Sequence, residues 1–168
     1  MEQGTFVKIS RVQRYFGVGP LGALVSFVFL AIAWGVDYRV GHAAIWPDPL
    51  PMRFAGGAII LVGLVFHFWT MYALRNWWAE DRLCTQGPFR WVRHPMYAAW
   101  ITVILPGFAL FLNSWIMICS VVVIHPIWHR LAVREETMMS DKFQNEYRSY
   151  AARTGRFFPR IGKSRRSF

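Results

Sequence analysis

The chain has 168 residues, of which 55% are hydrophobic and nine are Trp, so it has one domain's length and is too apolar for a soluble fold. Its formal charge of +10 does not indicate nucleic acid, because the basic residues lie outside the long apolar runs, where anionic membrane lipids attract them. Of the two Cys, one lies in a polar loop and one within an apolar run, so neither a disulfide framework nor a metal site is indicated.

The N-terminal segment, residues 1–17, is basic and amphipathic. Lys8, Arg11 and Arg14 are spaced by three residues and cluster on one side of a short helix, which we expect to lie at the membrane interface. No small-residue cleavage site separates it from the apolar segment that follows, so we expect no cleaved signal peptide.

Four apolar segments over residues 18–129 predict an all-α, polytopic membrane helical bundle in a single domain. The predicted transmembrane helices are Val18–Val36, Phe54–Leu74, Met96–Leu112 and Trp115–His129. The third is short and contains Pro106, which predicts a kink, and only Asn113-Ser114 separates it from the fourth.

The first loop and the second span carry three further features. Several prolines between residues 37 and 53, Pro49 and Pro51 among them, argue against a regular helix there. Gly56 and Gly63 are seven residues apart on one face, which would let another helix approach closely. His67 lies inside the span, where an ionisable residue indicates a functional site, although a neutral His bonded to a neighbouring helix is equally ordinary.

The distribution of positive charge predicts the orientation. Only Arg39 and Arg53 fall in the segments assigned to the outer side, and the other 17 of the 19 Lys and Arg lie in the N-terminus, the loop Arg75–Pro95 and the tail. By the positive-inside rule, both termini and this loop face the cytoplasm. The protein would be an integral protein of a bacterial-type inner membrane or an endomembrane.

The tail, residues 130–168, is expected to begin as a C-terminal cytoplasmic helix over Arg130–Ala151. A stripe of larger side chains recurs there at spacings of four, four and three residues, a pattern that usually serves packing. Its members are Met139, Phe143, Tyr147 and Tyr150. Beyond Gly155 we expect a loose basic end that faces anionic lipids.

The stretch Gly87–Tyr97, G-P-F-R-W-V-R-H-P-M-Y, is the most polar and rigid passage between two long apolar segments. Its Gly-Pro pair is a turn signal, and Pro95 suits the first turn of a helix. The free N–H groups of that turn favour an anion, with Arg93 and His94 beside them. The plainer interpretation is a basic interfacial anchor before a transmembrane helix.

A second polar cluster, Arg130, Arg134, Glu135 and Glu136, follows the last apolar segment on the same predicted side. Arg130 and Arg134 share a helical face, whereas the two Glu diverge by about 100°, so at most one of them should face a given pocket. A solvated surface with weak ion pairs is the alternative. Cationic donors and one carboxylate at the mouth of a bundle can also hold a zwitterionic ligand.

Taken in order, these motifs resemble the isoprenylcysteine carboxyl methyltransferase and phospholipid methyltransferase superfamily. They are G-P-F-R-W-V-R-H-P-M-Y at 87–97, R-E-E at 134–136, F-x-x-E-Y-x-x-Y at 143–150 and R-x-x-R-F-x-P from 153, and the similarity covers about residues 54–160. The resemblance implies a small helical membrane enzyme that binds S-adenosylmethionine from the cytoplasmic side and methylates a lipophilic acceptor from the bilayer.

The resemblance also implies roles for individual residues. The cofactor pocket would be lined by Gly87, Arg93, His94, Pro95 and Tyr97, with Glu136 or Glu135 as a further cofactor contact. Catalysis would fall to Arg130 or Arg134, as the basic residue near the transfer site, and to Glu135. The chain departs from the family pattern at two positions where Gly is common, since it has Ala99 and Gln144 there.

The acceptor's functional group stays open between a carboxylate, a thiol and an amine. An Arg would orient a carboxylate, whereas an amine would require aromatic faces and a base. We expect a lipophilic acceptor to enter sideways between the helices, near Trp77, Trp78 or Trp100. Two other functions compete with methyl transfer: a non-enzymatic lipid-binding scaffold and a membrane reductase with a similar helical core. No obligate protein partner is indicated.

Overall fold

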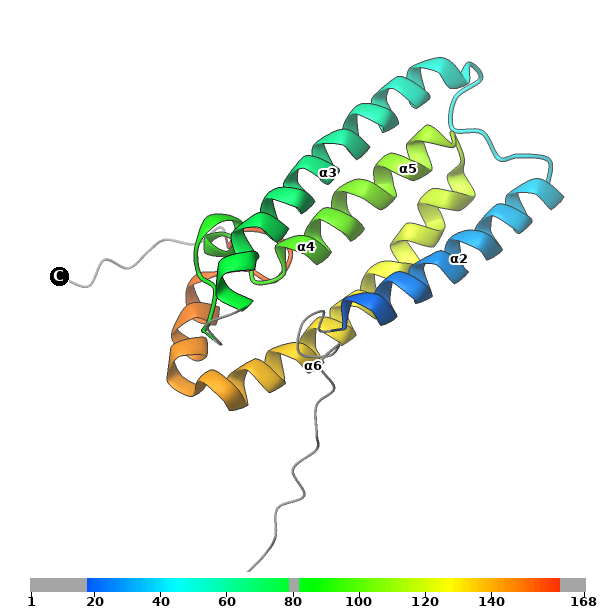
Figure 1. The fold of residues 1–168 in the computed structure, drawn as a ribbon. Coiled ribbons are helices and arrows are strands. Elements are labelled where there is room, and N and C mark those ends of the chain that lie inside the picture. Colours follow the sequence, from blue (N-terminus) through cyan, green and yellow to red (C-terminus); the bar gives the residue numbers. More distant parts are fainter. Residues whose placement is uncertain (1–17, 79–81, 161–168) are drawn as a thin grey trace, which may run out of the picture.

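The computed structural model describes residues 18–78 and 82–160, and these residues form helices and loops without an extended strand. The long helices, which run side by side in Figure 1, are α2 (Gly19–Arg39), α3 (Pro49–Trp78) and α6 (Trp115–Arg153). Between α3 and α6 lie the short 3-10 helix η1 (Gly87–Arg90) and one continuous helical run, which consists of α4 (Pro95–Ala98), η2 (Ala99–Ile104) and α5 (Leu105–Phe111). The predicted all-α class is confirmed. The predicted interfacial helix and the loose basic end lie largely outside the described residues.

Among the described residues, three helices are long and apolar enough to cross a membrane, namely α2, α3 and α6. The run Pro95–Phe111 is apolar but shorter. All four predicted spans are therefore helical in the structure.

The prediction that residues 37–53 lack regular helix is wrong at both ends of that segment, because α2 reaches Arg39 and α3 begins at Pro49. Helix α3 begins at Pro49 and continues to Trp78, so both Pro49 and Pro51 lie in its first turn. Proline is tolerated there because the first N–H groups of a helix have no intrahelical partner. The side chain of Asp48 accepts a hydrogen bond from the N–H of Leu50 at 3.0 Å and marks the start of the helix.

Helix α3 packs closely on α5, as its two glycines predicted. A Cβ on Gly56 would lie 2.4 Å from the backbone nitrogen of Phe111 and 2.5 Å from the carbonyl oxygen of Gly107. A Cβ on Gly63 would lie 2.6 Å from Cγ1 of Ile104. Helix α2 packs instead mainly on α6 (Figure 1).

The third span contains a π-helical segment, Ala99–Ile104, just before Pro106, where the sequence predicts a kink. Proline removes one helical hydrogen bond and its ring crowds the preceding turn. A wider π turn directly before it accommodates that change without breaking the helix. This π-helical segment begins two residues after the end of the G-P-F-R-W-V-R-H-P-M-Y motif.

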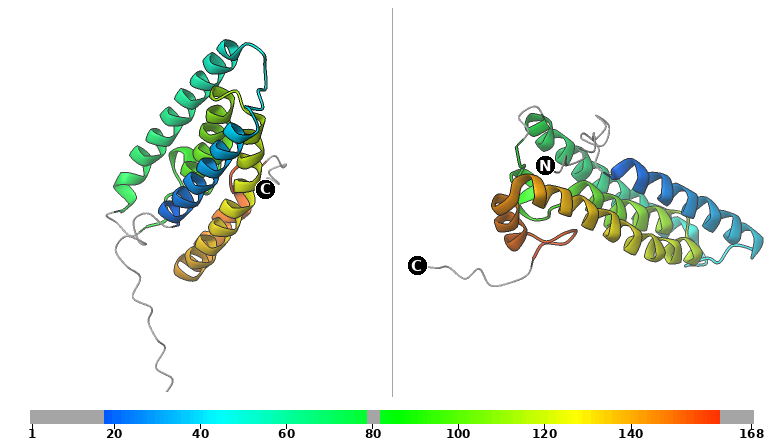
Figure 2. Two further views of the ribbon diagram at one scale, coloured as in Figure 1. Left: turned by 90° about the vertical axis from the view of Figure 1, so that its right-hand side faces the viewer. Right: turned by 90° about the horizontal axis from the view of Figure 1, so that it is seen from below.

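Helix α6 extends well beyond the predicted end at His129 and contains Pro126 in its interior. The predicted separate helix from Arg130 is therefore a continuation of α6, which reaches Arg153. The actual break occurs at Gln144, where φ is 44° and ψ is −119°. After it the chain turns back toward the end of the bundle (Figure 2).

Gln144 occupies a backbone conformation that normally requires glycine, and it stands where the resembling family has Gly. A non-glycine residue held there costs about 1–3 kcal/mol. We expect Gln144→Gly to raise the midpoint of thermal unfolding by several degrees, measured by circular dichroism in detergent micelles. The exposed helical residue Glu146 supplies the control, since Glu146→Gly should lower the midpoint. A lower midpoint in Gln144→Gly would show that the strain is absent.

Candidate functional site

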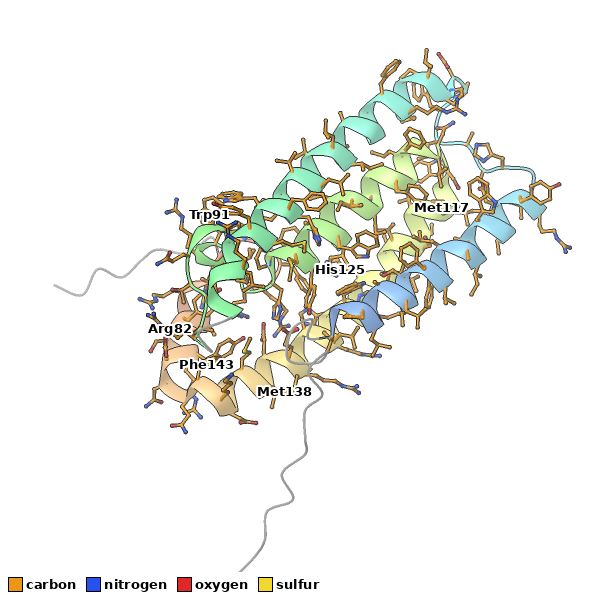
Figure 3. All side chains as sticks on the ribbon, viewed as in Figure 1. Arg82, Trp91, Met117, His125, Met138 and Phe143 are labelled. Atoms are coloured by element: carbon orange, nitrogen blue, oxygen red, sulfur yellow. The ribbon has the colours of Figure 1, made fainter. Side chains whose placement is uncertain are left out.

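The motif at 87–97 and the end of α6 meet at one end of the bundle. Val92 and Gly155 form a parallel bridge, in which the N–H of Arg93 donates to the carbonyl of Gly155 at 2.8 Å and that of His94 to the carbonyl of Arg156 at 3.1 Å. In Figure 3 the side chains of Arg82, Trp91 and Phe143 gather at this end, away from Met117. Residues 62 positions apart in the sequence are thereby held side by side.

The predicted stripe of larger side chains on α6 is packed, as expected, at this end of the bundle. Tyr147 and Tyr150 are buried with Leu83, and Met139 and Phe143 pack against them. The hydroxyl of Tyr150 donates to the carbonyl of Phe89 at 2.7 Å and so fixes η1. Burial raises the pKa of Tyr150, so its hydroxyl stays protonated as a donor.

Gly87 and Pro95 shape the backbone of the motif. Gly87 has a φ of 56°, which suits the turn into η1, and a Cβ there would lie 3.2 Å from that of Ala73. Pro95 is the first residue of α4 and follows His94, whose carbonyl accepts from the N–H of Ala98 at 2.8 Å. These residues place Arg93, His94 and Tyr97 on the side that faces α6.

Glu136 is the centre of the polar cluster at this end. Its Oε1 accepts from Nε of Arg93 at 2.9 Å and from Nε of Arg156 at 2.9 Å, and its Oε2 accepts from Nη2 of Arg156 at 2.7 Å. Nε2 of His94 lies 3.3 Å from Oε1, but the pair is not aligned as a hydrogen bond, so this buried nitrogen has no bonded partner among the described residues. Arg93 also donates to the carbonyls of Ala151 and Thr154.

Glu135 faces the same cluster, so the prediction that only one of the two Glu would do so is wrong. Its Oε2 accepts from the hydroxyl of Tyr97 at 2.8 Å and lies 3.9 Å from Nδ1 of His94. The ring of His94 stacks on that of Tyr97, with 5.3 Å between centroids. The ring therefore presents Nδ1 to Glu135 and Nε2 to Glu136. In this way one side chain reaches two successive residues of α6 whose directions differ by about 100°.

The arginines determine the charge state of Glu136. Burial alone would raise the pKa of this carboxyl, but the contacts from Arg156, His94 and Arg93 outweigh burial and hold its pKa well below the usual range. Glu136 is therefore ionised at neutral pH. With Arg93, Arg156 and Glu135, it forms a mixed-charge cluster in which the side chains of Arg93 and Glu136 are only 13% and 15% exposed.

Two predicted catalytic residues are not brought into this cluster. Arg130 and Arg134 are exposed on α6, without an ion pair or hydrogen bond to any described residue. Arg156 takes a place in the cluster that we had not predicted for it, although it stands in the R-x-x-R-F-x-P motif. The sequence offered one signal for this role: the two carboxylates, Glu135 and Glu136, need more than one cationic partner, and Arg156 lies in a motif that carries the family resemblance. Arg156 also contacts Nε2 of His129 at 2.6 Å.

Comparison with known proteins identifies the family of the chain. The family model described as phospholipid methyltransferase matches residues 52–146, which is more than half of the chain and includes the motif at 87–97 and both Glu. No curated protein and no solved structure shows significant similarity to the chain. The chain therefore belongs to the phospholipid methyltransferase family.

Proposed function

We propose that the protein is an S-adenosylmethionine-dependent methyltransferase that methylates a membrane lipid at the end of the bundle where His94 lies. The observation that carries this proposal is the cluster in which His94 stands between Glu135 and Glu136, with Arg93 and Arg156 beside them. Such a cluster suits a ligand that carries both signs of charge. The ring of His94 lies within 3.9 Å of both carboxylates, so it can adjust its contacts when such a ligand binds.

The residues present fit this cofactor by their chemistry. Arg93 and Arg156 would attract its carboxylate, and Glu135 would attract its cationic groups, since only one oxygen of Glu135 is occupied by Tyr97. When bound, the cofactor supplies an electrophilic methyl group. The chain's own contribution is alignment, because in-line displacement depends mainly on the positions of the reacting atoms. Glu136 contributes by holding the two arginines in place.

The proposed topology has four transmembrane helices, with both termini and the site on the cytoplasmic side. The charge distribution supports it, because the end of the bundle with Arg93 and Arg156 is also the end to which most Lys and Arg belong. The run Pro95–Phe111 would be the short fourth span, about 25 Å long at 1.5 Å per residue.

Family membership favours a phospholipid amine over a carboxylate or thiol as the acceptor. We assign to Glu135 the acceptance of the proton that an ammonium acceptor must lose before its nitrogen can attack. Arg130 and Arg134, exposed on α6, would bind phosphates of anionic lipids near the entrance rather than the reacting atoms.

The proposed cofactor is tested by titrating the purified protein with S-adenosylhomocysteine in an isothermal calorimeter. We expect saturable heat with one ligand per chain, because the mixed-charge cluster is preformed. A lipid-binding scaffold or a reductase would give no heat even at high ligand concentration. That result would overturn the proposal, and a parallel titration with nicotinamide dinucleotides would then test the reductase.

The entry route of the acceptor is tested with phosphatidylethanolamines of increasing acyl chain length in lipid bicelles. Each buried CH₂ contributes up to about 0.8 kcal/mol, so longer chains should lower the apparent KM while kcat changes little. Lateral entry between the helices predicts this dependence. If short, soluble acceptors react as efficiently as long ones, lateral entry is wrong and a small soluble acceptor replaces the lipid.

A further inference from the structure

Two polar side-chain atoms inside the bundle are buried without a hydrogen-bond partner among the described residues and are separate from the charged cluster. They are Nε1 of Trp100 and Nδ1 of His67. Buried polar groups are nearly always bonded, because leaving one unbonded sacrifices the hydrogen bond it made with water. Two such atoms in an apolar bundle indicate a partner that the chain itself does not supply.

The two atoms belong to the same level of the bundle. Gly56 packs on Phe111 and Gly63 on Ile104, so α3 runs antiparallel to the run 95–111. His67 is four residues after Gly63 on α3, and Trp100 is four residues before Ile104 on the antiparallel run, so the two residues lie at about the same level. Trp100 also lies in the π-helical segment Ala99–Ile104, and such segments occur frequently at functional sites.

Trp100 is one helical turn beyond Tyr97 and is therefore one turn deeper in the bundle than the His94 cluster. Its ring contacts Phe27 of α2 edge to face, with 5.9 Å between centroids. Phe27 reaches Trp100 from α2, and α3 packs on η2, the segment that contains Trp100, so both helices approach the run at this level.

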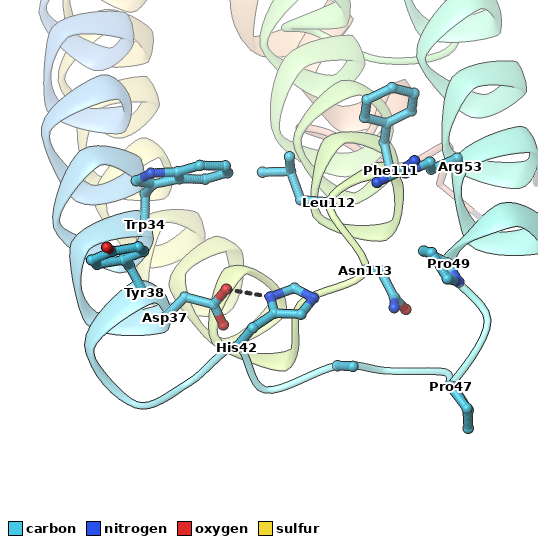
Figure 4. Close-up of a pocket in the computed structure, with 11 residues that line it drawn as sticks. Trp34, Asp37, Tyr38, His42, Pro47, Pro49, Arg53, Phe111, Leu112 and Asn113 are labelled. Atoms are coloured by element: carbon cyan, nitrogen blue, oxygen red, sulfur yellow. Dashed lines mark hydrogen bonds and ion pairs between the residues drawn. The ribbon is translucent and has the colours of Figure 1, made fainter.

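A pocket of about 650 Å³ lies between the same two helices, at their opposite end, lined from α2 by Trp34 and Tyr38 and from α3 by Arg53 (Figure 4). Phe27 and Trp34 are seven residues apart on α2, and Arg53 and His67 are fourteen apart on α3. Each spacing keeps the two residues on one helical face. The faces that line the pocket thus continue to the level of Trp100 and His67.

We propose that Trp100 and His67 bind a carbonyl oxygen in the membrane-buried part of the acceptor, with the acceptor's chain lying along the side between α2 and α3. An indole N–H only donates, so the partner of Trp100 is a hydrogen-bond acceptor, and His67 can donate to the same oxygen in the tautomer that carries the proton on Nδ1. The ester carbonyls of a glycerophospholipid lie just below its headgroup, as Trp100 lies just below the His94 cluster. This inference rests on the proposed function and specifies the acceptor as an acyl ester.

The first test compares two phosphatidylethanolamine probes in bicelles, a diester and its diether analogue without carbonyl oxygens. We expect the wild type to show a KM about three- to tenfold lower for the diester. Trp100→Phe keeps an aromatic ring but removes the N–H, so it should abolish this preference by raising the diester KM alone. Trp69→Phe, on the exposed side of α3, is the control and should keep the preference. An equal KM for both probes in the wild type would overturn the inference.

A second measurement needs no turnover. The indole ¹H–¹⁵N resonance of Trp100, assigned by its loss in Trp100→Phe, should shift when diester replaces diether in the bicelle, and His67→Phe should reduce the shift. An unmoved resonance contradicts the inference. Calorimetry with S-adenosylhomocysteine tests the proposed function independently of Trp100, and absence of binding heat would overturn that function. Normal binding heat without a shift of the indole resonance would overturn only the carbonyl site. Normal calorimetry of Trp100→Phe also shows that this variant is folded.

Discussion

Glu136→Ala is expected to weaken the binding of S-adenosylhomocysteine by about ten- to a hundredfold. The carboxylate joins Arg93 of the motif to Arg156 of the C-terminal segment, with three hydrogen bonds of 2.7–2.9 Å. A hydrogen bond to a charged group contributes about 1.5–3 kcal/mol, and the side chains are 13–21% exposed, so solvent screens part of this. Removing Glu136 leaves two guanidinium groups close together without their shared anion.

Isothermal titration measures this effect, and Glu146→Ala is the matched control. Glu146 lies on the same helix, is exposed and has no contact with the cluster, so its loss should leave the affinity unchanged. His94→Ala should resemble Glu136→Ala, because His94 stands between both carboxylates. If both cluster variants bind as tightly as the wild type, the cofactor site lies elsewhere.

Much of the helical fold was predictable, because it depends on the length and apolarity of continuous segments. The errors occurred where proline was interpreted without its position in a helix. The prolines between residues 37 and 53 predict a loop, yet Pro49 and Pro51 lie in the first turn of α3, which accepts them. Helix α6 also passes through Pro126 without ending there. In an apolar helix packed along its length, tertiary contacts outweigh the loss of one hydrogen bond.

The candidate site was predictable in part for a different reason. His94, Arg93 and Tyr97 lie in one short motif, so local spacing was enough to group them. That both Glu135 and Glu136 face His94 depends on how α6 crosses the motif, which helical periodicity alone cannot supply. Arg156 enters the site because the break at Gln144 returns the chain to Val92, and no helical pattern predicts such a return.

The second large effect is expected at the contact between α3 and α5, where Gly56→Ala should destabilise the protein and Gly57→Ala should not. A methyl group on Gly56 would come within 2.4–2.5 Å of backbone atoms of Phe111 and Gly107, which no side-chain rotation can relieve. The two helices must move apart, at a cost of about 1–3 kcal/mol or more. A methyl group on Gly57 meets only a ring carbon of Phe111 at 4.0 Å, and Ala favours helix over Gly.

Thermal unfolding in micelles would measure the difference between these two neighbouring glycines, and calorimetry would show its consequence for the site. Helix α5 continues directly from η2 and α4, which begins beside His94, so separation of α3 from α5 displaces the base on which the His94 cluster stands. We therefore expect Gly56→Ala to lower both the unfolding midpoint and the affinity for S-adenosylhomocysteine, while Gly57→Ala preserves both. Equal behaviour of the two variants would mean that α3 and α5 do not approach this closely in the membrane. A lower midpoint with unchanged affinity would instead show that the His94 cluster is held mainly by α6 and by the Val92–Gly155 bridge, independently of α3.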